Sequence, residues 1–368
     1  HPPPFLVCAP QNWKVVAVSR AFAGSARTLN GYPICYAEHH SDRKGNTLMS
    51  THPAAAHRHS VTTAAILATV FTIGVSPQVG AADTEPLRNA FPDQMLAAVG
   101  RRIVILAKDG TVAREIKTEG LVHDAWLLPS GNVLYANGKA VAEVTPEGTT
   151  VFEYRAKVQE GGGTYACQRL DNGNTFIGEN STGRLVEVDS SGKIVAEVQA
   201  QGCVKGKHHN LRMVRKLKNG NILACHSGGK RVVEYASDGT VVWEFTPPKA
   251  GLAYTALRLD NGNTMVSVLN RVAEFSPDGT VAWEFTNKDI PGATITNMTG
   301  FHLLANGNLV IGCYAAFDKQ TKQGTLLFEI TRGKQLVWSY SRHDLGGTCL
   351  AVQRLDGQGR ALPGSTTR

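Results

Sequence analysis

A short phrase centred on Gly-Asn recurs five times along the chain, with a spacing of 42 to 47 residues. The Asn of the phrase falls at Asn132, Asn174, Asn221, Asn263 and Asn308. Apolar residues flank each copy, as in LDNGNTFIG and LKNGNILAC. A period of roughly 20 to 50 residues is typical of chains that build one supersecondary unit per repeat and stack those units. The chain is therefore expected to fold as an array of similar units.

A second phrase follows each copy of the first and also contains a Gly in a tight turn. Examples are ASDGTVVWEF and SPDGTVAWEF, in which apolar and polar residues alternate after the turn. Tight turns flanked by alternating residues indicate β-hairpins, so each period contains four strands. The 38 Gly in 368 residues also suit short strands and turns better than a helical bundle. Four short strands per period indicate the blades of a β-propeller.

The two ends of the array together supply a further blade. Residues 94–110 match the second, third and fourth strands of a period and lack a first strand. Residues 348–356, TCLAVQRLD, match the first strand TYACQRLD at 164–171. An open array would leave two unpaired edges, so we expect the last strand to join the first three. The sequence predicts an all-β fold, a six-bladed β-propeller with four antiparallel strands per blade.

The residues before 83 are expected to lie outside the propeller. The second part of this segment resembles a secretory signal peptide, because a 12-residue apolar run follows Arg58 and small residues precede Asp83. The run is too short for a stable transmembrane anchor, although an uncleaved signal anchor or a buried helix is the alternative. We therefore expect a periplasmic or secreted protein without stable membrane insertion. The expected parts are a disordered, non-native upstream extension (1–48), a signal peptide (49–82), the propeller (83–360) and a flexible tail (361–368).

The composition of residues 83–368 argues against two other classes of protein. This part has 32 basic and 28 acidic residues, a net charge of +4, and no basic run typical of nucleic-acid binding. We expect a monomer that binds no nucleic acid. Five cysteines are too few for a disulfide scaffold. We interpret Cys313 and Cys349 as small buried side chains, with a disulfide between them as the alternative.

Most histidines of this part fall in loops predicted for one face of the propeller. The loops that join strand four to the next strand one, and strand two to strand three, open around the central channel. His302 lies in a predicted strand. The histidines in such loops are His123, His208, His209, His226 and His343. A concave face with clustered polar groups is the default candidate for a binding site.

The residue nine positions before each repeated Asn should face the channel at a similar height. These residues are His123, Tyr165, Arg212, Tyr254 and Thr299. Arg offers a planar fork to a sulfate, phosphate or carboxylate, and Tyr rings stack on flat groups. We therefore predict a positive funnel that binds a small anionic or aromatic ligand, or a protein partner, without catalysis. The predicted ligand-binding residues are Tyr165, Tyr254, His208, His226, His343 and Lys207.

The blades also resemble those of bacterial PQQ-like and arylsulfotransferase propellers, in which NGNTL precedes VVEYDPDGKVVWE. The comparable segment here reads LKNGNILACHSGGKRVVEYASDGTVVWEF, and the resemblance covers residues 94–356. It implies an alternative function, the transfer of a sulfuryl group by a channel His. His123 or His209 would then be the nucleophile, and Arg212 would stabilise charge on the transferred oxygens. We expect no cofactor, and no PQQ in particular because the chain lacks a Cys-Cys pair.

A metal site is the second alternative function. Histidine rings and a thiolate are suitable ligands for zinc or copper. The histidines of the loop face would supply the rings. The chain contains no CxxC or HExxH spacing, so the sequence does not select among them.

Overall fold

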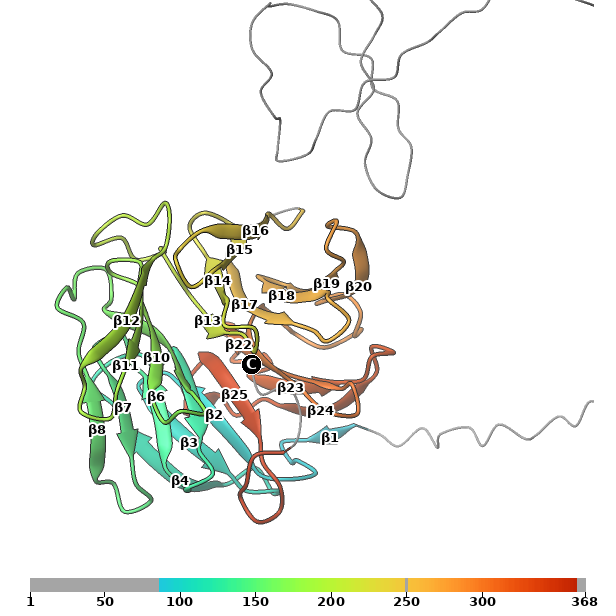
Figure 1. The fold of residues 1–368 in the computed structure, drawn as a ribbon. Coiled ribbons are helices and arrows are strands. Elements are labelled where there is room, and N and C mark those ends of the chain that lie inside the picture. The colour runs from blue at the N-terminus through green and yellow to red at the C-terminus, as the bar shows by residue number, and fades with distance from the viewer. Residues whose placement is uncertain (1–85, 249–250, 363–368) are drawn as a thin grey trace, which may run out of the picture. The chain divides into compact units, whose positions relative to one another are not determined.

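Six antiparallel sheets surround a central axis in the computed structural model, which describes residues 86–248 and 251–362 (Figure 1). Each sheet has four strands from one blade, and one sheet carries a fifth strand. The predicted six-bladed β-propeller is thus confirmed. The predicted extension and signal peptide lie outside the described residues. Within those residues, no helix has the length and apolar content needed to cross a membrane.

The first three complete blades follow one another along the chain in the same strand order. The first contains β5 (Asp124–Leu127), β6 (Val133–Ala136), β7 (Val141–Val144) and β8 (Thr150–Tyr154). The second contains β9 (Thr164–Arg169), β10 (Thr175–Glu179), β11 (Arg184–Val188) and β12 (Ile194–Gln199). The third contains β13 (Val214–Lys216), β14 (Ile222–His226), β15 (Arg231–Tyr235) and β16 (Val241–Phe245).

Two more complete blades precede the blade that closes the ring. The fourth contains β17 (Ala253–Arg258), β18 (Thr264–Val268), β19 (Arg271–Phe275) and β20 (Val281–Thr286). The fifth contains β21 (Asn297–Leu303), β22 (Leu309–Tyr314), β23 (Leu327–Ile330) and β24 (Leu336–Tyr340). A short 3-10 helix, η1 (His343–Leu345), leads from it to the last strand.

The closing blade combines both ends of the repeat array, as predicted. It contains β25 (Cys349–Arg354), β2 (Met95–Val99), β3 (Arg102–Leu106) and β4 (Val112–Lys117). Met95 lies opposite Arg354, and Val99 lies opposite Cys349. Because β25 is the first strand of this blade and β2 is the second, the ring closes through ordinary antiparallel pairing.

The structure adds a strand that the sequence did not predict. β1 (Leu87–Arg88) pairs in parallel with β24, on the outer edge of the fifth blade. Phe91 then packs with its ring centroid 4.8 Å from that of Trp338. The chain therefore passes from the fifth blade to the closing blade twice, once between β1 and β2 and once between β24 and β25.

The burial of each strand follows its place in the blade. All residues of second strands such as β10 and β14 are buried, because neighbouring blades cover both faces. Fourth strands such as β16 alternate between exposed and half-buried residues, as expected for an outer strand. Cys313 and Cys349 are buried and free, so the prediction of small buried side chains agrees with the structure.

A repeated polar contact joins neighbouring blades on the face that carries the Gly-Asn turns. In each of the five complete blades, the repeated Asn donates through Nδ2 to a Glu of the third strand, at 2.6–2.7 Å. The same Glu pairs with a cation, usually the last residue of the next blade's first strand. The pairs are Glu143–Arg169, Glu187–Lys216, Glu234–Arg258, Glu274–Arg332 and Glu329–Arg354. We call these contacts the interblade ion pairs.

Removing the carboxylate at the closing joint should destabilise the fold strongly. Glu329 is almost fully buried and accepts from Asn308, Trp338 and Arg354. Glu329→Ala should cost about 3 kcal/mol of unfolding free energy, because the buried Trp338 N–H loses its acceptor and Arg354 keeps only its second carboxylate, Asp93. Urea unfolding followed by tryptophan fluorescence measures this loss.

The matched control is Glu244→Ala. Glu244 pairs with Arg231 at 2.7 Å, but its side chain is 52% exposed. An exposed pair contributes about 1 kcal/mol or less. Equal losses in the two variants would show that the interblade ion pairs do not support the ring.

Candidate functional site

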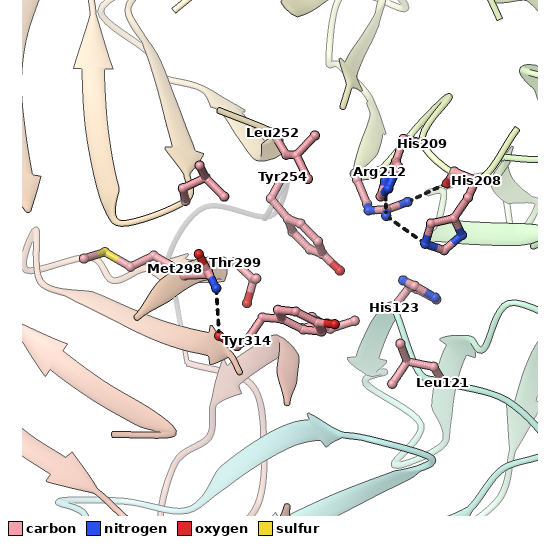
Figure 2. A pocket seen from close by; sticks show the side chains of 13 residues that line it. Leu121, His123, His208, His209, Arg212, Leu252, Tyr254, Met298, Thr299 and Tyr314 are labelled. Atoms are coloured by element: carbon pink, nitrogen blue, oxygen red, sulfur yellow. Dashed lines mark hydrogen bonds between the residues drawn. The ribbon is translucent and has the colours of Figure 1, made fainter. Parts of the chain in front are cut away.

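A pocket of about 220 Å³ opens at the end of the channel where the predicted loop face lies. Figure 2 shows side chains from several blades converging on it. The polar part of its wall contains His123, His208, His209, Arg212 and Tyr254. The remaining lining residues are Leu121, Leu252, Leu269, Asn297, Met298, Thr299, Tyr314 and Leu350. The pocket thus combines one cation and a histidine cluster with a largely apolar wall.

Arg212 is the only permanently charged side chain that lines this pocket. Three arginines of the described residues are buried, and two of them pair with a carboxylate: Arg215 with Asp124, and Arg271 with Glu284. Arg212 instead donates to the carbonyl oxygens of His208 and Leu211 and to two histidine rings. No carboxylate of the described residues pairs with it, so its positive charge is uncompensated.

The contacts of Arg212 determine the protonation of its two histidine neighbours. Its Nη2 lies 2.9 Å from His209 Nδ1 and 3.4 Å from His208 Nε2. A guanidinium only donates, so both of these ring nitrogens accept and carry no proton. Burial, followed by the charge of Arg212, also lowers the pKa of His208 and of His209. Both rings are therefore neutral near pH 7.

His123 is the most buried histidine of the pocket. Its ring stacks on the ring of Tyr165, with centroids 3.7 Å apart. Burial, and then the charge of Arg212, holds its pKa well below the ordinary value. Its Nδ1 is buried and has no hydrogen-bond partner in the described structure. A buried polar atom without a partner is costly, and this one needs a ligand or water atom to satisfy it.

Tyr165 lies behind the pocket wall and supports it. Its hydroxyl oxygen lies 2.7 Å from His208 Nδ1, and the Arg212 guanidinium carbon lies 4.8 Å from its ring centroid. Gly162 makes this packing possible, because its φ is +92° and a Cβ there would overlap the Tyr165 hydroxyl. The GGG segment at 161–163 thus allows a close contact between loop and ring.

Tyr254 supplies the second unpartnered polar atom of the site. Figure 2 shows its hydroxyl pointing into the middle of the pocket. The hydroxyl oxygen is buried and has no hydrogen-bond partner in the described structure. Burial raises the pKa of Tyr254 far above its ordinary value, so the hydroxyl keeps its proton and can donate. Arg212 lies 5.8 Å from the ring centroid, so the cation and this donor face the same space.

A buried ion pair next to His123 fixes the start of β5. Asp124 and Arg215 are 0% and 1% exposed and lie 2.8 Å apart. Asp124 also accepts from the backbone N–H of Cys167, and Arg215 stacks over Trp126. Because the pair connects the first and third blades, it holds the strands that carry His123 and Arg212 in a fixed relation.

A second, more open hollow of about 670 Å³ adjoins the pocket and shares His208 and His209 with it. Lys207 and His226 line this hollow rather than the pocket. His226 is buried, and its Nε2 lies 2.7 Å from the hydroxyl of Tyr235. His343 lies in η1, with its ring near Phe317, and lines neither of these two cavities.

The prediction that channel residues lie nine positions before each repeated Asn therefore identified most of the polar residues of the wall. It did not identify the apolar ones. Four of its five residues line the pocket, and Tyr165 supports them. In the closing blade, Leu350 takes the place of Tyr165, because the sequence QRLD follows at 353–356 as it does at 168–171, and Leu350 also lines the pocket. Within the described residues, no three His, Cys, Asp or Glu side chains are grouped as a metal would need.

Comparisons with known proteins support the fold. A protein of unknown function from Bacteroides caccae superposes with a TM-score of 0.63 at 19% identity, covering 71% of this chain and 98% of its own. A streptogramin B lyase gives 0.49 at 12% identity, covering 68% and 80%. An inactive virginiamycin B lyase from Staphylococcus aureus with quinupristin gives 0.48 at 14% identity, covering 66% and 83%. No family model and no curated protein matches the chain.

Fold and comparison together define the class of this protein as a six-bladed β-propeller. At 19% identity the likeness to the Bacteroides caccae protein extends to the fold and no further. What the pocket binds must therefore be argued from its own residues.

The buried histidines should make the fold less stable in mild acid. Burial, and then the charge of Arg231, lowers the pKa of His226 to about 4. The unfolded chain binds this proton from about pH 6.5 downward and the folded chain does not. The stabilisation is therefore complete above pH 6.5 and is lost as the pH falls toward 4, by about 3 kcal/mol from this residue.

Unfolding free energies between pH 7.5 and 4.5 measure this effect. His226→Gln should flatten the pH dependence, because the amide does not titrate. His343→Gln is the matched control, since His343 is exposed in η1, and it should keep the wild-type slope. An unchanged slope in His226→Gln would contradict the assignment.

Proposed function

We propose that this chain is an exported binding propeller whose pocket holds a small organic anion. Export rests on the likeness of residues 49–82 to a signal peptide. The observation that carries the binding function is Arg212, a buried guanidinium without a carboxylate. Burying an unpaired charge is strongly unfavourable, so a chain that keeps one in a pocket provides a site for an anion.

The rest of the pocket supports an organic ligand rather than a bare inorganic ion. Leucine side chains form much of the rest of the wall. Ligand sites typically combine an apolar wall with a few placed polar groups that fix orientation. Here the anionic end would meet Arg212, and the apolar body would lie against Leu252, Leu269 and Leu350.

Replacing Arg212 should remove most of the affinity for such an anion. Benzoate and phenyl sulfate are suitable compounds for isothermal titration. Hydrogen bonds to charged groups contribute about 1.5–3 kcal/mol, so Arg212→Gln should weaken binding about tenfold or more. Lys139→Met is the matched control, because Lys139 is an exposed cation in the loop between β6 and β7, outside the pocket.

Two outcomes would refute the binding function. The first is no measurable binding of either anion to the wild-type protein. The second is equal affinity in Arg212→Gln and Lys139→Met, provided that both variants unfold at the wild-type urea midpoint.

Sulfuryl transfer is the second candidate, and the unpartnered nitrogen of His123 favours it. A neutral imidazole nitrogen could attack the sulfur of an aryl sulfate, so that an N–S bond forms and the phenolate leaves. A phenol acceptor would then attack the sulfur as its proton passes to the departed phenolate, so that an O–S bond forms, the N–S bond breaks and the imidazole is released. His209 suits the nucleophile role less well, because its Nδ1 already accepts from Arg212.

A direct assay tests this second function. The protein would be incubated with 4-nitrophenyl sulfate and excess phenol, and release of 4-nitrophenol followed. Release that His123→Ala abolishes, with binding of the sulfate retained, would support transfer. No release, or release unchanged in His123→Ala, would exclude it and leave the binding function standing.

A further inference from the structure

We infer that the pocket selects aromatic anions of a single negative charge and one ring, either carboxylates or sulfate esters, over doubly charged phosphates. The inference rests on the proposed binding function and goes further, since it specifies the charge, size and polar contacts of the ligand. Three features of the pocket carry it: its single cation, its volume and its two unpartnered polar atoms.

The charge of the pocket is fixed at one. Arg212 is the single charged side chain of the lining, which contains no Asp or Glu. His208 and His209 are neutral because each accepts from Arg212. His123 is neutral because it is buried beside the same cation. The nearest buried ion pair, Asp124–Arg215, is internally balanced and adds no net charge.

A single cation balances one negative charge and leaves a second one uncompensated. In water the difference would be small, but much of this wall consists of the side chains of Leu121, Leu252, Leu269 and Leu350. Moving an unpaired charge from water into such surroundings is costly. For a dianion, the free energy lost on leaving water would therefore exceed the attraction to Arg212. For a monoanion, the single charge of Arg212 would balance the charge of the ligand.

The volume limits the body of the ligand. An apolar protein cavity of about 150 Å³ accommodates one benzene molecule. The pocket here, at about 220 Å³, has room for one ring and an anionic group of a few atoms. Tyr254 and Tyr314 present aromatic side chains to this space, and aromatic rings pair favourably in offset or edge arrangements.

The two unpartnered atoms fix how the anion would lie. The Tyr254 hydroxyl keeps its proton, so it can donate to one anionic oxygen while Arg212 donates to another. His123 Nδ1 is the remaining buried atom without a partner, and a substituent on the ring or a bound water would satisfy it. Tyr254 is thus a specificity residue for anions with at least two oxygens.

Phenyl sulfate and phenyl phosphate provide a matched pair for the test. They have the same shape, but the sulfate keeps one charge at all working pH values, whereas the phosphate loses its second proton near pH ~6. Affinities of the wild-type protein for both would be measured by isothermal titration at pH 5, 6, 7 and 8. The ratio of the two affinities removes any effect of pH that changes both affinities equally.

We expect the affinity of phenyl phosphate relative to phenyl sulfate to fall at least tenfold between pH 5 and pH 8. Benzoate, measured in parallel, shows whether carboxylates or sulfate esters bind more tightly. A ratio that stays constant, or that rises with pH, would overturn the selectivity. Absence of binding by all three compounds would instead overturn the binding function, so the two failures are distinguishable.

Two variants test the physical cause. Leu121→Lys adds a second cation to the apolar wall and should reduce or reverse the discrimination against phenyl phosphate at pH 8. Tyr254→Phe removes one donor and should weaken phenyl sulfate and phenyl phosphate about fivefold each, with little change in their ratio. A Leu121→Lys variant that folds and discriminates as strongly as wild type would contradict the charge-balance argument.

Discussion

The interblade ion pairs are the interaction on which the rest of this molecule depends. Each joins the repeated Asn of one blade, a buried Glu of the same blade and a cation of the next blade. This explains why the Asn and the Glu recur with the blade period: the pair they help to build lies between blades. The closing strand takes part in the same way, since Arg354 of β25 reaches Glu329 of the fifth blade. The ring thus closes with the contact that it uses elsewhere, and β1 adds a backbone connection at the same joint.

Regular blades place equivalent residues at equivalent heights along the channel, so the chemistry of the site comes from variation at one repeated position. That position holds His123, Tyr165, Arg212, Tyr254, Thr299 and Leu350 around the ring. The neighbouring position contributes differently. Asp124 follows His123 and pairs with Arg215 of the third blade, which connects blades that are not adjacent. Rigid blades with a variable inner surface suit a binding site. The stability of the blades offsets the unfavourable free energy of holding unpaired polar atoms in fixed positions.

The sequence predicted the blades, their strand order and the closing joint because each depends on local patterns: turn residues, alternation and a fixed period. It predicted the polar channel residues because their spacing from the repeated Asn is constant. It could not predict Leu252, Met298 or Tyr314 in the wall, since they lie at other distances from that Asn. Nor did it predict β1, because two residues carry no recognisable period. The sequence places five histidines in loops of one face, yet His226 and His343 do not line the pocket, since that face is wider than the channel opening.

Arg212 links the structural and chemical properties of the pocket. A cluster of histidines near neutral pH would ordinarily carry a variable charge, and anion binding would then change with every small shift in pH. Here the guanidinium donates to two of the rings and its field disfavours protonation of all three. The same cation therefore supplies the attraction for an anion and keeps the surrounding rings neutral. Because the charge of the pocket comes from a group that does not titrate, its preference is set by the charge of the ligand rather than by the protonation of the protein.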